Sequence, residues 1–156
     1  MQTSHTNDQD SIQWIGHWSE DILAIDPGRT SGIAYLTRGG EFRTTTSRCV
    51  EKYLQRANPR VVIIERFRWH GRGSPSRDAI EMRHLIDRLI ILCGSRGIRA
   101  VMVEPRARVP FIGRARVLLA AVPCAQVSDH NEDAMAHLLA YLAQESSVDW
   151  HERGAA

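Results

Sequence analysis

Residues 21–36 read DILAIDPGRTSGIAYL, and this stretch decides the fold. Residues 22–25 form an apolar run with the length of a strand buried on both faces, and the run stops at Asp26. The proline that follows lacks an N–H and Gly28 tolerates a positive φ, so we expect a sharp turn with the Asp26 carboxylate at the tip of the strand. A second apolar run, residues 33–36, completes a predicted β-hairpin. Aspartate before Pro-Gly is also ordinary turn chemistry, so a turn cap remains an alternative for Asp26.

Two further apolar runs end in an acid in the same way. Residues 60–65, RVVIIE, end at Glu65, and residues 99–104, RAVMVE, end at Glu104. We expect the strand of Asp26 to lie beside the strand of Glu65. Glu104 is expected to pair with a nearby arginine.

The other elements follow from apolar spacing and from start and stop residues. They are a third strand over 41–46, a helix over 47–57, a helix that opens at Ser74-Pro75 and ends at Gly94 or Gly97, a short helix over 114–121 and a last helix from 128. Three strands first, followed by parallel crossovers, predict a mixed α/β sheet flanked by helices.

The last helix opens with SDHNED, residues 128–133. Asp129 and Glu132 have the spacing of a capping box, which makes Asp129 the expected N-cap. His130 and Asp133 are then three residues apart and share one face of the first turns. His137 lies one turn further on, and a lone helical histidine is usually structural.

Asp26, Glu65 and Asp133 in one cleft would repel one another unless a cation lies between them. Carboxylate oxygens favour Mg²⁺ or Mn²⁺ over zinc. Two such ions would activate a water and stabilise the leaving oxygen of a phosphodiester. His130 would be a ligand or would orient the water.

Chain length and composition limit the classes to which this protein can belong. A chain of 156 residues with 43% hydrophobic and 24% charged residues indicates one globular domain. We expect a flexible tail over 1–20, the domain over 21–146 and a C-terminal tail over 147–156. No apolar run is long enough for a membrane span and no signal peptide is evident, which favours the cytoplasm. The three cysteines (Cys49, Cys93 and Cys124) show no metal or disulfide spacing and are expected to be reduced.

Charge is segregated along the chain. Residues 66–116 hold 12 arginines and 4 acids, whereas 117–156 hold one arginine and 6 acids. This favours a surface for a polyanion, with a solvated charge mixture as the alternative. The loop over 66–77 interleaves arginines with Phe67 and Trp69, which is typical of contacts to phosphates and exposed bases. Phe67 packed into the core is equally compatible. The candidate DNA contacts in this loop are Arg66, Phe67, Arg68, Trp69, Arg72 and Arg77.

The motifs DPGRTSG, VVIIE and HNEDA, in this order, resemble those of the RuvC family of Holliday junction resolvases, across residues 21–143. The resemblance implies an RNase H-like five-stranded sheet and symmetric nicking of branched DNA by a homodimer. It makes Asp26, Glu65 and Asp133 the metal ligands, with His130 in the fourth position, around what would be two Mg²⁺ ions.

The resemblance also has departures, which suit a phage-type member. The basic residues that bind the junction arms in the family are commonly lysines towards the C-terminal part, and here Arg108, Arg114 and Arg116 would take their place as DNA contacts. In the family an aromatic residue commonly lies three residues after the second acid, and here that position is Arg68. The dimer would form through the helix that contains Met82, Leu85, Ile86 and Leu89.

Three other functions remain open from the sequence. The first is a branched-DNA or RNase H-like nuclease without four-way-junction selectivity. The second is an ATPase of the actin and sugar-kinase type, which one domain of this size disfavours because the second lobe is missing. The third is a DNA-binding protein that has lost catalysis, which the complete acid set disfavours.

Overall fold

The computed structural model describes the chain over residues 20–121 and 128–153, with side chains up to residue 146. The expected tail over 1–19 and Cys124 lie outside the described residues. The elements in chain order are β1 (Ile22–Asp26), β2 (Ser31–Leu36), β3 (Phe42–Ser47), α2 (Val50–Ala57), β4 (Val61–Glu65), α3 (Arg77–Ser95), β5 (Arg99–Val103), the 3₁₀ helix η2 (Pro105–Phe111), α4 (Ile112–Ala121) and α5 (Asp129–Arg153). α5 therefore continues past residue 146, where the domain was expected to end.

The five strands form one mixed sheet in the order β3-β2-β1-β4-β5. β1 pairs antiparallel with β2 and parallel with β4, and β4 pairs parallel with β5. The predicted hairpin and mixed sheet are confirmed. Ile25 lies opposite Ile64, so Asp26 and Glu65 follow at the same edge of the sheet on neighbouring strands.

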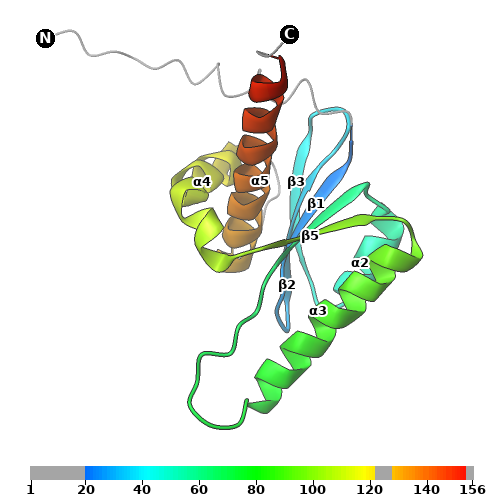
Figure 1. Ribbon diagram of the computed structural model, residues 1–156, viewed down its shortest axis with the longest axis vertical. Helices are drawn as coiled ribbons and strands as arrows, with labels where there is room; N and C mark the ends of the chain where they lie inside the picture. Colours follow the sequence, from blue (N-terminus) through cyan, green and yellow to red (C-terminus); the bar gives the residue numbers. More distant parts are fainter. Residues whose placement is uncertain (1–19, 122–127, 154–156) are drawn as a thin grey trace, which may run out of the picture.

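Helices cover both faces of the sheet, with α4 and α5 on one side and α2 and α3 on the other (Figure 1). Ile22 and Ala24 point into the core under α4 and α5, whereas Leu23 and Ile25 point into the core under α2 and α3. All four side chains are at most 1% exposed. A strand buried on both faces reads as an unbroken apolar run, which explains why β1 shows no alternation.

Three details of the predicted turns and caps are wrong. Gly28 is not among the glycines with positive φ; instead the Ser31 Oγ accepts a hydrogen bond from the Gly28 N–H at 3.2 Å and closes the turn. α3 begins after Ser76, whose Oγ accepts from the Ala79 N–H at 3.2 Å, so Ser74 is not its cap. α5 is capped by Ser128, whose Oγ accepts from the Asn131 N–H at 3.2 Å, so Asp129 is not the N-cap.

The end of α3 is set by Gly97. Its φ of +67° is the left-handed conformation that glycine adopts without strain. The Ile98 N–H donates to the Cys93 carbonyl at 2.9 Å, which closes a Schellman motif. Of the two glycines expected to end this helix, Gly97 does so, and the chain can turn directly into β5.

Candidate active site

Asp26 and Glu65 end neighbouring parallel strands and face the beginning of α5. Asp26 is 7% exposed, and Glu65 is partly buried. Two loops and a helix meet at this edge of the sheet, so each acid can be reached by side chains from elsewhere in the sequence. The position at the carboxyl ends of parallel strands is where α/β sheets commonly bind ligands.

Gly32 allows α5 to lie directly against the hairpin. A Cβ atom built on Gly32 would be 2.0 Å from the His130 carbonyl oxygen, a distance that no side chain could keep. With no side chain at this position, the first turn of α5 reaches Asp26. The His130 Nδ1 lies 2.7 Å from the Asp26 Oδ2.

Arg108 joins the two other acids. Its Nη1 donates to the Glu65 Oε2 at 2.9 Å and its Nε donates to the Asp133 Oδ1 at 2.9 Å. The same Nη1 also donates to the Pro105 carbonyl at 2.8 Å, within η2. One guanidinium therefore neutralises the acid at the end of β4 and the acid on α5. Arg108 was predicted as a DNA contact, and its position between two acids was not expected.

His137, which was expected to be structural, is buried and contacts one of the acids. It is 1% exposed, and its Nε2 lies 2.5 Å from the Glu65 Oε2. Its Nδ1 is buried and has no hydrogen-bond partner in the part of the chain that the structure describes. The signal that could have found it is its spacing: it follows Asp133 by four residues and His130 by seven, so all three lie along one face of α5.

The electrostatics of the cluster are visible at Asp26. Burial raises the pKa of Asp26 above its usual value, and the charges of Glu65 and Asp133 raise the pKa further. The hydrogen bond from His130 opposes this rise. The three acids therefore act on one another, and the cluster gains from an added cation.

The donors of Asp26, Glu65 and Asp133 are carboxylate oxygens, which are the ligands that a hard divalent ion prefers. They come from three separate elements. As the side chains stand, no three His, Cys, Asp or Glu side chains over 20–121 and 128–146 form a set that could hold a metal. The hydrogen bonds explain why: Glu65 and Asp133 are bound by Arg108, and Asp26 is bound by His130. A divalent ion held by Asp26, Glu65, Asp133 and His130 requires Arg108 to release at least one acid.

Comparison with solved structures identifies the fold. Thermus thermophilus RuvC in complex with Holliday junction substrate matches with a TM-score of 0.56 and 16% sequence identity, covering 77% of this chain and 91% of that chain. A second structure of Thermus thermophilus RuvC matches with a TM-score of 0.54 and 13% identity, covering 81% and 96%. The yeast mitochondrial Holliday junction resolvase matches with a TM-score of 0.55 and 11% identity, covering 88% and 86%. This chain has the RuvC fold.

The predicted RNase H-like sheet is therefore confirmed, in both strand order and neighbours. No protein-family model matches the sequence, and no curated protein matches it. At these identities the RuvC likeness establishes the fold and leaves the activity to the chemistry of the site. No helix in the described part of this RuvC fold is long and apolar enough to cross a membrane.

The loop between β4 and α3, which extends beyond the RuvC-type sheet in Figure 1, carries most of the candidate DNA contacts. Phe67 and Trp69 are 42% and 44% exposed, so Phe67 is not packed into the core. Glu104 binds Arg68 at 2.8 Å and lies 3.6 Å from Arg66, as expected for a strand-end acid beside arginines. Next to this loop lies an open hollow of about 300 Å³, whose lining includes these two arginines and Phe67.

The other candidate DNA contacts differ in how they are held. Arg77 pairs with Glu81 and Arg116 pairs with Glu132, each at 2.8 Å. Arg72 and Arg114 are exposed and have no ion pair among the residues that the structure describes. The structure thus brings Asp26, Glu65, His130 and Asp133 together with Arg108, and leaves these four arginines on the surface.

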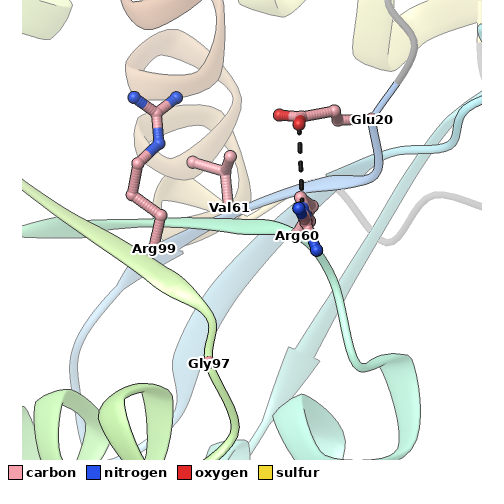
Figure 2. Close-up of a pocket in the computed structure, with 5 residues that line it drawn as sticks. All are labelled: Glu20, Arg60, Val61, Gly97 and Arg99. Carbon is pink, nitrogen blue, oxygen red and sulfur yellow. Dashed lines mark ion pairs between the residues drawn. The ribbon is translucent and has the colours of Figure 1, made fainter.

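A second cavity of the RuvC-type domain lies away from the acids. It has a volume of about 340 Å³ and is lined by Glu20, Arg60, Val61, Gly97 and Arg99 (Figure 2). Arg60 lies 3.8 Å from Glu20, and the Arg99 side chain extends along α5, where it binds the Tyr141 hydroxyl. Glu20 lies just before β1, and the other four residues lie at or just before the starts of β4 and β5, which is the edge of the sheet opposite the acids. This cavity therefore has no part in the acid cluster.

Proposed function

We propose that this protein is a member of the RuvC family and a divalent-metal-dependent endonuclease that resolves Holliday junctions and other branched DNA. The observation that carries the proposal is the meeting of Asp26, Glu65, His130 and Asp133 at one edge of an RNase H-like sheet. Three acids in this arrangement supply oxygen ligands for Mg²⁺, or Mn²⁺ in its place, and we propose two ions. These ions would activate a water and stabilise the leaving oxygen of the phosphodiester.

The protein's own residues would divide the work. Asp26 and Glu65 would be metal ligands, and their places on adjacent strands would keep them at a constant separation. Asp133 and His130 come from the first turns of α5, at the positive end of the helix dipole, where negative charge is stabilised. His130, which is half exposed, would take the fourth position and fix the Asp26 carboxylate through its Nδ1.

DNA would lie across the surface that the candidate contacts form. Arginines pair with phosphates, and exposed aromatic rings stack on unpaired bases. The contacts proposed for this role are Arg66, Phe67, Arg68, Trp69, Arg72, Arg77, Arg114 and Arg116. The two Holliday junction resolvases that share the fold, one of them bound to its junction substrate, support a branched DNA as the partner.

Symmetric nicking would require two copies, and α3 offers an apolar surface for pairing. Ile86 and Leu89 lie in the core, so of the four residues expected at this interface only Met82 and Leu85 are partly exposed. Met82 and Leu85 pack against the same core, so the expected interface face of this helix is turned towards the sheet. Ile80 and Ile91 are exposed on the opposite face, with Ile91 70% exposed, and a pairing through this helix would use that face. A homodimer through this helix should be weakened by Ile91→Glu, which a molar-mass measurement by light scattering would detect.

A cleavage assay tests the proposal. Four-way, three-way and flap DNA and a linear duplex are incubated with the protein in Mg²⁺ or in EDTA. We expect cleavage of the four-way junction in Mg²⁺ only, at symmetric positions on two strands, and loss of cleavage with retained binding in Asp26→Asn. Equal cleavage of all branched substrates would favour the less selective nuclease, and cleavage by Asp26→Asn would refute the assignment of the acids.

A further inference from the structure

We infer that His137 is a positioning residue that fixes the Glu65 carboxylate in place for metal binding. The inference rests on the proposed function, because it concerns the same acid cluster. His137 lies beneath the site, on α5, where the sequence alone suggested a structural histidine. Four observations support a more specific role: its burial, its single polar partner, its unpaired nitrogen and the way Glu65 is shared.

The surroundings of His137 are those of a core residue. Its helical neighbours Ala134, Ala136, Leu138 and Tyr141 are all buried in the core cluster under α4 and α5. An apolar side chain would fill this place without leaving a polar atom unpaired. Imidazole instead leaves its Nδ1 buried without a partner in the described chain, which is unfavourable. The bond from Nε2 to Glu65 is the favourable contact that offsets it.

The contact also fixes the proton on the imidazole ring. A carboxylate oxygen only accepts hydrogen bonds, so the His137 Nε2 must carry a proton and donate it. The ring is held by the packing of α5, and its donor therefore points in one direction. Glu65 has three rotatable bonds and ends a strand, so a donor in a fixed position restricts where its carboxylate can lie.

Glu65 is held through one oxygen by two donors of different kinds. Both the His137 Nε2 and the Arg108 Nη1 bind its Oε2. Arg108 comes from η2 and is partly exposed, whereas His137 is buried in the core. When Arg108 releases the acids, His137 still holds Oε2, and Oε1 is left for a cation. His137 thus keeps Glu65 oriented through the exchange of arginine for metal.

The test measures metal binding without DNA. Mn²⁺ affinity is determined by titration calorimetry for wild type, His137→Leu and His137→Gln, whose amide nitrogen can replace Nε2 as a donor. Loss of a hydrogen bond to a metal ligand typically lowers metal affinity by about 10–100-fold. We expect that loss in His137→Leu and an affinity within about threefold of wild type in His137→Gln.

Leu138→Ala is the matched control, because Leu138 is fully buried in the core cluster beside His137 on the same helix and its apolar side chain cannot donate a hydrogen bond to an acid. It should lower the melting temperature and leave Mn²⁺ affinity unchanged. Equal weakening by His137→Leu and Leu138→Ala would reduce His137 to a core residue and overturn the inference, as would unchanged affinity in His137→Leu.

A spectroscopic measurement covers the case in which His137→Leu does not fold. Nitrogen NMR of the imidazole in metal-free wild type should show a protonated Nε2 whose resonance shifts in Glu65→Ala. A ring with no proton on Nε2 overturns the inference. If the protein cleaves no DNA but the variants differ in Mn²⁺ affinity as expected, the nuclease is refuted and the role of His137 stands. If wild type does not bind Mn²⁺ at all, both the nuclease and the role of His137 are refuted.

Discussion

Removal of Arg108 should make the metal-free protein less stable and its metal affinity higher. The guanidinium makes two charge-assisted hydrogen bonds of 2.9 Å, to Glu65 and Asp133, with the three side chains between 18% and 27% exposed. Exposed ion pairs contribute up to about 1 kcal/mol, and breaking a buried pair costs about 3–5 kcal/mol. Side chains that are partly exposed fall between these limits, so we expect Arg108→Gln to lower the free energy of unfolding by about 2 kcal/mol.

The same contact sets the cost of binding a cation. A divalent ion that binds wild type must displace Arg108 from at least one acid, whereas in Arg108→Gln the acids are already free. If the full cost of about 2 kcal/mol is removed, affinity for Mn²⁺ rises by up to about 30-fold. In EDTA the variant should melt about 4–8 °C below wild type, and the gap should narrow as Mg²⁺ is added, since a ligand that binds only the folded state stabilises it.

Differential scanning fluorimetry in EDTA and across a Mg²⁺ series, with calorimetric titration of Mn²⁺, measures both effects. Arg77→Gln is the control, because Arg77 pairs with Glu81, which is not one of the acids of the cluster, and the two side chains are 91% and 52% exposed. It should change stability by less than about 1 kcal/mol and leave metal affinity unchanged. An Arg108→Gln variant as stable as wild type in EDTA, or with weaker metal binding, would refute the reasoning.

Three further predictions follow from single contacts. Gly32→Ala forces the first turn of α5 away from the hairpin and should separate His130 from Asp26. We expect the free energy of unfolding to fall by about 3 kcal/mol and the melting temperature by about 6–12 °C. A melting temperature equal to that of wild type would contradict the close approach of α5 to Gly32. Burial raises the pKa of Asp26 above 3.8, so between the pKa of the unfolded chain and that of the folded protein the folded wild type holds a proton that the unfolded chain has lost, and its stability falls as pH rises. Asp26→Asn removes this titrating group, so the stability of the variant relative to wild type in EDTA should increase from acid to neutral pH. A constant difference in melting temperature between the two proteins would contradict this. Cys49 is exposed, whereas Cys93 is buried and burial raises the pKa of its thiol, so a thiol reagent at neutral pH should modify Cys49 quickly and Cys93 only on unfolding, with equal rates by mass spectrometry as the contrary result.

The sheet was predictable because its strands carry their own signal. Buried strands need unbroken apolar runs, and the turn residues after residue 26 leave little choice but a hairpin. The order of the acids then follows from parallel pairing, since Asp26 and Glu65 must end at the same edge. Hard oxygen donors at that edge were therefore foreseeable from composition and order alone.

The caps and the cationic contact were less predictable for a physical reason. Ser128 and Asp129 are both good N-cap residues and differ by one position, so the choice depends on how α5 packs and not on local preference. Arg108 has several carboxylates within reach of a long side chain, and only the position of η2 decides which ones it binds. The role of His137 depends on a contact with Glu65, 72 residues away in the chain.

β1 is the middle strand of the sheet, with two strands on each side. Its amide protons should exchange with solvent only when the whole domain opens, because both neighbours must separate first. The first turn of α5 and η2, by contrast, are terminal or short segments that can detach by themselves. Local opening of these segments would separate His130 and Arg108 from the acids of the strands while Asp26 stays on an intact sheet. Amides around His130 and Arg108 should therefore exchange long before those of β1.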